Sequence, residues 1–272
     1  MWNIIKSGIF TQDGKEARAE DDLTGESGGI IAVWGAPGSG KTSVAVKLAK
    51  LLTDKNKPVA LLLCDMTAPM LPCICPKNDM EDERSLKSIF AATHPSESLI
   101  KHNAVRHKRI GGLMMFGLLK GENEHSCRPQ SEEQVAELLQ VLESMAPYVI
   151  VDCSSYISGD ILSAVALMEA DCVLRLSGCD LKSVSYFSSQ LPLLTEAKWD
   201  ADKQIKIASN VKLSQMSEAQ QEIHGKMAFT LPHSVELSTQ YLNGDLFENL
   251  SNKESRLYRK ELKKICREVF GC

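Results

Sequence analysis

The sequence has no apolar run of the roughly 20 residues that a membrane-spanning helix needs. Its first thirty residues lack the basic start, apolar core and small-residue cleavage site of a secretory signal peptide. A surplus of positive charge is also missing, because the formal net charge is −4, so the chain carries no global footprint for nucleic acid. These absences predict a cytoplasmic protein with no specific nucleic-acid signature.

Zinc-ligand spacing is absent as well. Of the nine cysteines, Cys73 and Cys75 form the only close pair, and no second pair stands at the spacing that a zinc site requires. Cys64, Cys153 and Cys172 fall in or beside predicted buried strands, where a free thiol behaves as a small apolar side chain. We therefore expect reduced thiols rather than a bound metal.

No linker-like stretch divides the sequence into separate domains. We therefore expect residues 29–272 to form one domain, preceded by a polar and acidic lead-in over residues 1–28. The composition, 43% hydrophobic and 24% charged, is typical of a globular protein with a sizeable core.

The most informative stretch that is present runs over residues 29–52. Apolar residues 30–34 predict a buried strand, and residues 35–42, GAPGSGKT, fit the phosphate-loop pattern G-x-x-x-x-G-K-[ST] at every fixed position. An amphipathic run with apolar residues at helical spacing follows. Strand, glycine loop and helix together are the context that separates this motif from a chance glycine-rich turn.

The chemistry of a polyphosphate explains these residue types. Such an anion needs backbone N–H groups facing it, and glycines allow both the unusual backbone angles and the close approach. The helix that follows directs its positive end at the phosphates. Lys41 would contact the β- and γ-phosphates, and the Thr42 hydroxyl would ligate Mg²⁺. The residues expected to hold the nucleotide here are Gly35, Ala36, Pro37, Gly38, Ser39, Gly40, Lys41, Thr42 and Ser43.

Two later strands are predicted to end in an aspartate. Residues 148–152, YVIVD, have the form of a Walker B strand, whose carboxylate Asp152 would bind Mg²⁺ together with Thr42. Residues 58–65, PVALLLCD, end in Asp65, which a parallel sheet would place on the same rim as the glycine loop. We expect catalytic roles for Lys41, Asp65 and Asp152; capping of the following turn is the alternative role of Asp65.

The remaining pattern alternates strands with helices, which predicts right-handed βαβ units. The expected fold is therefore a three-layer α/β/α P-loop NTPase fold with a mostly parallel central sheet. Ser131 and Gln134 form a candidate capping box at the start of one helix. One helix each is expected over residues 81–100, 130–146 and 235–242, and further strands over 113–117, 172–176, 204–210 and 226–231.

The last twenty residues, 253–272, predict a basic amphipathic helix. Its apolar positions fall on one face and seven Lys or Arg residues occupy the rest. One interpretation is a terminal helix packed on the sheet with its basic face in solvent. The other is peripheral contact with an anionic membrane surface. The apolar face consists of Tyr258, Leu262, Ile265, Cys266 and Val269.

The order of these motifs resembles the MinD/ParA group of P-loop ATPases, in the SIMIBI class, from Gly29 to the tail. After Asp65, TAPMLP is similar to that family's first switch segment, and YVIVDCSS is similar to its second. IASN ends at Asn210, which matches the asparagine that contacts adenine, and Pro232 lies in the family's late proline turn. The resemblance implies ATP or ADP with Mg²⁺ as ligands, nucleotide contacts from Asn210 and Pro232, and an ATP-dependent homodimer.

One position departs from the family pattern. The family's loop carries a second lysine that crosses the dimer interface, and this sequence has Ala36 there. TadZ/CpaE-like pilus-localisation ATPases also include altered loops, but they carry a receiver-like domain for which 28 residues are too few. Since an arginine finger supplied in trans accelerates phosphoryl transfer by about 10³-fold or more, we expect slow or partner-stimulated hydrolysis here.

Three functions remain open at this point. The leading one is an ATP-binding switch ATPase that positions or partitions a cellular component, with an unidentified protein partner. The second is a nucleotide-binding interaction module with negligible hydrolysis. The third is a small-molecule kinase, for which residues 101–109, KHNAVRHKR, could supply a cationic lid.

Overall fold

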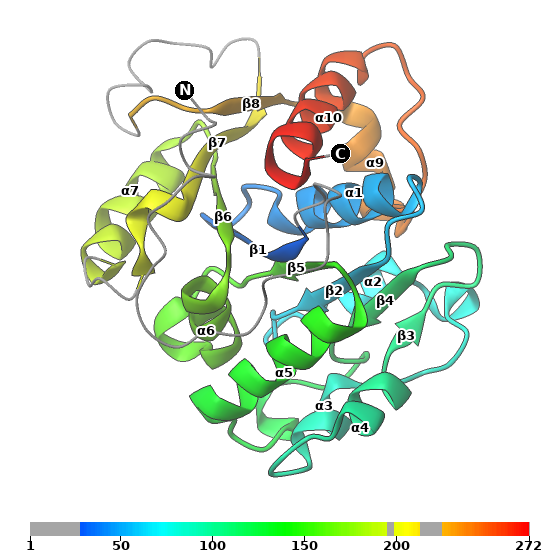
Figure 1. Cartoon of the computed structure of the whole chain (residues 1–272). Helices are drawn as coiled ribbons and strands as arrows, with labels where there is room; N and C mark the ends of the chain where they lie inside the picture. The colour runs from blue at the N-terminus through cyan, green and yellow to red at the C-terminus, as the bar shows by residue number, and fades with distance from the viewer. Residues whose placement is uncertain (1–27, 195–198, 213–224, 272) are drawn as a thin grey trace, which may run out of the picture.

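The chain folds around an eight-stranded sheet in the order β3-β4-β2-β5-β1-β6-β7-β8, as Figure 1 shows. This computed structural model describes residues 28–194, 199–212 and 225–271, so all but the last residue of the expected lead-in lies outside the described residues. The pairs within the sheet are parallel except β3 with β4. The strands are β1 (Gly29–Gly35), β2 (Val59–Leu63), β3 (Val105–Arg106), β4 (Leu113–Phe116), β5 (Tyr148–Asp152), β6 (Cys172–Ser177), β7 (Gln204–Val211) and β8 (Phe229–Pro232).

Helices cover both faces of this sheet, and each face has its own apolar core. Ile31 and Val33 of β1 face the core under α1 and α10, while Ala32 and Trp34 face the core under α5 and α6. The predicted three-layer P-loop NTPase fold with a mostly parallel sheet is thereby confirmed (Figure 1). The helices are α1 (Lys41–Thr53), α2 (Leu71–Ile74), α3 (Leu86–Phe90), α4 (Glu97–His102), α5 (Glu132–Met145), α6 (Ile161–Glu169), α7 (Leu181–Gln190), α9 (Val235–Asn243) and α10 (Arg256–Phe270).

The register of the central strands determines where their ends lie. Val33 of β1 and Leu63 of β2 both pair with Asp152, the last residue of β5. Because these strands are parallel, their carboxyl ends meet at one edge of the sheet, where parallel sheets bind their ligands. The loop between β1 and α1 starts at this edge.

The segment 81–100 is not one helix, and that expectation was wrong. The structure has two short helices, α3 and α4, separated by residues 91–96. The Ser85 hydroxyl accepts from Lys87 N–H at the start of α3, and the Ser96 hydroxyl accepts from Leu99 N–H at the start of α4. Two serine N-caps, with Pro95 just before the second, favour new helix starts over continuation.

The start of α5 agrees with the sequence prediction. The Ser131 hydroxyl accepts from Gln134 N–H at 3.3 Å, and the Gln134 side chain accepts from Ser131 N–H at 3.1 Å. This is the predicted capping box.

The last strand, β8, starts at Phe229, three residues later than the sequence pattern suggests.

The terminal helix α10 packs against α1 and β8 through its apolar face. Leu262 is only 3% exposed, and Ile265 and Phe270 are buried in the same core as α1. The apolar stripe is thus used in packing, which is the first of the two interpretations of the tail. Among the described residues, none of the helices combines the length and the apolarity that crossing a bilayer would take.

Replacing Leu262 with Ala is expected to lower the free energy of unfolding by about 2–5 kcal/mol, because it leaves a cavity in the core. Leu257→Ala on the same helix is the matched control, since that side chain is 64% exposed. The control should change stability by less than about 0.5 kcal/mol. Denaturant unfolding measures both, and equal losses would contradict this orientation of α10.

Candidate functional site

A cavity of about 860 Å³ lies at the carboxyl edge of the sheet. Its walls come from the loop before α1, the ends of β5, β7 and β8, and helices α9 and α10. The structure therefore brings residues far apart in the sequence to one place. The predicted site residues that line the cavity are Pro37, Gly38, Gly40, Lys41, Thr42, Ser43, Asp65, Asp152, Asn210 and Pro232.

The three other loop residues of the predicted set, Gly35, Ala36 and Ser39, lie beneath this surface. Ala36 is fully buried, and its N–H donates to Leu176 O of β6 at 3.2 Å. At Gly35 a Cβ atom would lie 2.0 Å from that same carbonyl oxygen. Only glycine therefore fits where the loop leaves β1, because the neighbouring strand occupies the space of a side chain.

The loop reaches the helix through two residues with left-handed backbone angles. Gly38 has φ 79° and Gly40 has φ 82°, a region that other residues adopt only with strain. Gly40 is the residue before the first turn of α1, and its side-chain position faces Ser209 Oγ at 3.7 Å. The open N-terminus of α1 thus faces the cavity, as anion binding by a helix end requires.

Lys41 folds back over the loop. Its ammonium group donates to Ser155 Oγ at 2.6 Å and to Ala36 O at 3.3 Å. Burial lowers the pKa of Lys41, although Asp152, Cys153 and Asp65 act in the opposite direction. Ser155 in turn donates to Gly35 O at 2.9 Å, so one hydroxyl links the ammonium group to the loop.

Asp152 is buried, and burial raises the pKa of its carboxyl to about 6, with Asp65 adding to this effect. A hydrogen bond from Thr42 and the charge of Lys41 oppose the shift. Its Oδ1 atom has no hydrogen-bond partner among the described residues. A buried carboxylate with one unpaired oxygen atom, next to a threonine hydroxyl, suits a hard divalent cation such as Mg²⁺.

A cation here would depend on ligands from outside the chain. Within the described ranges, no group of three or more His, Cys, Asp or Glu side chains is arranged to hold a metal. Mg²⁺ commonly uses one or two protein oxygens and completes its octahedron with phosphate and water. Thr42 and Asp152 fit that pattern.

Asp65 caps the turn that follows β2. Its Oδ1 accepts from Thr67 N–H at 3.0 Å and from Ala68 N–H at 2.8 Å. This is the alternative role that the sequence left open. The carboxylate also lines the cavity, so its catalytic role stays a prediction.

Another wall of the cavity is built by the ends of β7 and β8. Asn210 has φ 58°, and the β7–β8 register shifts between Ala208 and Val211. The Asn210 Oδ1 atom lies 2.6 Å from the Nδ1 atom of His233. Pro232 is next to His233 and also lines the cavity, so the two residues expected near adenine share one wall.

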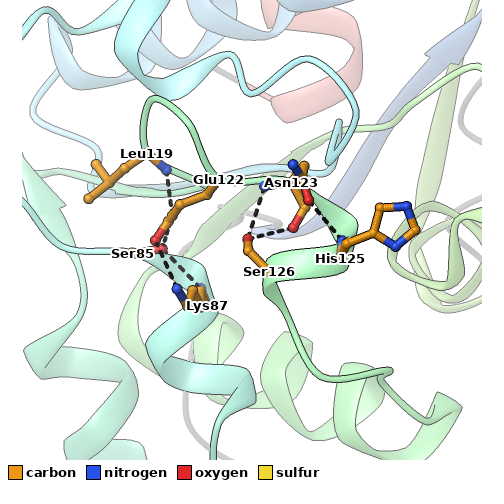
Figure 2. A network of polar contacts seen from close by, with 7 residues as sticks. All are labelled: Ser85, Lys87, Leu119, Glu122, Asn123, His125 and Ser126. Atoms are coloured by element: carbon orange, nitrogen blue, oxygen red, sulfur yellow. Dashed lines mark hydrogen bonds and ion pairs between the residues drawn. The ribbon is translucent and has the colours of Figure 1, made fainter.

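The loop after β4 contributes a further wall, and Figure 2 shows the contacts that hold it. The Glu122 carboxylate accepts from Ser85 Oγ at 2.5 Å and from Leu119 N–H at 2.8 Å. Asn123 caps the short turn that follows and exchanges hydrogen bonds with Ser126. These contacts fix the segment from which Glu124 reaches the cavity.

Sequence reasoning missed several wall residues. Ser155 lies three residues after Asp152, the last residue of the Walker B strand, and its place in the switch-like segment YVIVDCSS was the available indication. Ser209 precedes Asn210, and Ser234 follows the late proline turn. Tyr258 was assigned to core packing alone, because it lies on the apolar face of the tail helix.

The candidate kinase lid lies elsewhere. None of residues 101–109 lines the cavity, and Arg109 forms ion pairs with Asp79 and Glu248. Over the described part of the chain, Lys41 is the only Lys or Arg in the cavity wall. A cationic lid for a small-molecule kinase is therefore not found in the segment proposed for it.

Residues 29–207 match the model of a family described as an AAA domain. Three solved structures share the fold. A ParA family ATPase from Chlorobium tepidum is 16% identical with a TM-score of 0.72, over 87% of this chain and 98% of that one. The MinC:MinD complex of Aquifex aeolicus is 15% identical with a TM-score of 0.67, over 89% of this chain and 96% of that one. MinD of Pyrococcus horikoshii, complexed with Mg-ADP, is 12% identical with a TM-score of 0.65, over 88% of this chain and 95% of that one.

The chain belongs to this AAA-domain family, and its fold is that of the MinD/ParA-type P-loop ATPases. A search among curated proteins gives no significant match. The family and fold resemblance seen in the sequence is thus confirmed, whereas the narrower likeness to TadZ-like proteins is not.

Stability and ligand binding should depend on pH in opposite directions. Because the folded pKa of Asp152 is about 6 against an ordinary value of 3.8, the folded protein binds more protons between these values, and its stability falls as the pH rises through them. Binding of a cation needs the carboxylate, so MgADP affinity should fall as the pH drops below about 6.

Thermal unfolding without ligand and calorimetric titration with MgADP, both across this pH range, measure the two trends. Asp152→Asn should remove most of the slope in each. Asp160, whose pKa burial also raises, stays in both proteins and serves as the internal reference. Identical pH profiles for the two proteins would contradict the assignment to Asp152.

Proposed function

We propose that this chain is an ATP-binding switch ATPase, a MinD/ParA-like protein that positions or partitions a cellular component. The observation that carries the proposal is the pairing, in one cavity, of an open helix N-terminus with Lys41, Thr42 and the unpaired oxygen of Asp152. This set suits a triphosphate with Mg²⁺. The Mg-ADP complex of Pyrococcus horikoshii MinD supports ATP or ADP as the ligand.

Each group has a distinct part in the proposed reaction. The loop amides and Lys41 would hold the phosphates, and Thr42 and Asp152 would hold a cation that supplies charge neutralisation at the phosphate oxygens. Asp65 positions the attacking water or the first switch segment. Lys41 must leave Ser155 to reach a phosphate, so ligand binding alters the segment after β5.

The small number of positive charges in the cavity wall predicts slow or partner-stimulated hydrolysis. Ala36 replaces the family's second lysine and is fully buried, so nothing at this position reaches a partner's phosphates. Lys41 is the single Lys or Arg of the cavity wall in the described ranges. Since a cation supplied in trans can accelerate phosphoryl transfer by about 10³-fold or more, its loss predicts a low basal rate.

An ATP-dependent homodimer is part of the proposal. Tyr156, Tyr241 and Leu242 line the cavity, and their side chains are 67%, 47% and 81% exposed. Apolar side chains gathered at a cavity mouth favour a protein partner there. The MinC:MinD complex of Aquifex aeolicus supports a further protein partner, of unknown identity here. Membrane contact through residues 253–272 is the less favoured alternative, because the apolar face of α10 is packed.

Replacing Lys41 with Ala is expected to weaken MgATP and MgADP binding by about 10- to 100-fold, because a charge-assisted contact to phosphate is lost. Isothermal titration calorimetry measures both. Lys55→Ala, an exposed position just beyond the other end of α1, is the matched control and should bind like the original protein. If neither nucleotide binds the original protein, the proposed function is wrong.

Phosphate release separates the switch ATPase from the alternative of a module without hydrolysis. The purified protein should release phosphate slowly, with a rate per molecule that rises with protein concentration as dimers form. Asp152→Asn should abolish the release. A fast rate that does not depend on concentration would contradict the proposed lack of an in-trans cation, and no release at any concentration would favour the binding module.

A further inference from the structure

One residue of the cavity wall is a tyrosine of α10. Tyr258 of α10 is 3% exposed and lines the cavity. Its hydroxyl is buried and has no hydrogen-bond partner among the described residues. A buried tyrosine hydroxyl normally finds a partner, because an unmet one costs free energy.

The side chains around Tyr258 do not supply that partner. Ser234 Oγ lies 2.8 Å from Ser255 Oγ and accepts from Leu237 N–H at 3.1 Å, so its bonds are made within the α9–α10 junction. Ser209 also lines the cavity, and its Oγ atom lies 3.7 Å from a Cβ atom built on Gly40, beside the phosphate loop. Tyr258 follows Ser255 by one turn of α10, so it lies beside the α9–α10 junction and the end of β8.

This arrangement has the geometry of a two-ended site. The phosphate loop and Lys41 form one end, and the ends of β7 and β8 with Tyr258 form the other. A nucleotide that places its phosphates on the loop has its nucleoside part left to occupy the second end. A tyrosine hydroxyl can both donate and accept, so it can meet a ring nitrogen, an exocyclic amine or a ribose hydroxyl.

We propose that the hydroxyl of Tyr258 contacts the nucleoside part of the bound nucleotide, which makes α10 a part of the binding site as well as of the core. The inference rests on the proposed nucleotide binding and adds a residue to it. Burial raises the pKa of Tyr258, so the hydroxyl stays protonated and remains able to donate.

Tyr258→Phe tests the proposal, because it keeps the ring and removes only the hydroxyl. Without nucleotide, its thermal midpoint should equal or exceed that of the original protein, since an unmet buried polar group is removed. Its affinity for MgADP should be about three- to tenfold lower, the effect of one hydrogen bond. Tripolyphosphate, which lacks base and ribose, should compete equally with both proteins.

Tyr148→Phe is the matched control. Tyr148 is a buried tyrosine of the same core that does not line the cavity, so the change should leave MgADP affinity as it is. Equal MgADP affinity of Tyr258→Phe and the original protein would overturn the inference. A lower midpoint together with equal losses for MgADP and tripolyphosphate would also overturn it, because both indicate a structural role. Failure of the original protein to bind any of these ligands would instead overturn the proposed function.

Discussion

The close approach of the loop after β1 to strand β6 determines the geometry of everything else at the site. Gly35 has no room for a side chain against Leu176 O, and Ala36 N–H bonds to that same oxygen. The start of the loop is thus set by sheet packing rather than by contacts within the loop. Since β1 lies between β5 and β6, the carboxylate at the end of β5 comes within hydrogen-bond reach of Thr42 at the start of α1.

Burial acts against both charged groups at the centre of the site. It lowers the pKa of Lys41 and raises the pKa of Asp152, so each charged form is disfavoured in the protein alone. Their mutual attraction and the hydroxyls of Ser155 and Thr42 offset only part of that cost. A phosphate next to Lys41 and a cation next to Asp152 would stabilise both charges together, which is why ligand and cation should bind cooperatively.

The sequence alone was sufficient to predict those parts of the site that consist of residues close together along the chain. The loop 35–42 and the strand ending in Asp152 are local patterns, and the parallel sheet follows from their alternation with helices. Residues 81–100 were mispredicted because apolar periodicity does not show that two serine caps restart the helix. Tyr258 could not be recognised as a wall residue, since an apolar stripe has the same pattern whether a ring faces other side chains or the end of a cavity.

Helix α1 connects the phosphate loop with helices α9 and α10. Lys47, on the buried side of α1, donates to Gln240 Oε1 of α9 and to Glu248 O, both at 2.6 Å, and burial lowers its pKa to about 8. Leu48 of the same helix lies in one core with Leu262 of α10. The helix that begins at the phosphate loop is therefore bonded to α9 and packed on α10. A displacement of α1 on ligand binding must move these contacts or strain them, because packed cores are not continuously deformable. If a ligand at the phosphate loop displaced α1, the basic tail helix would therefore be displaced with it.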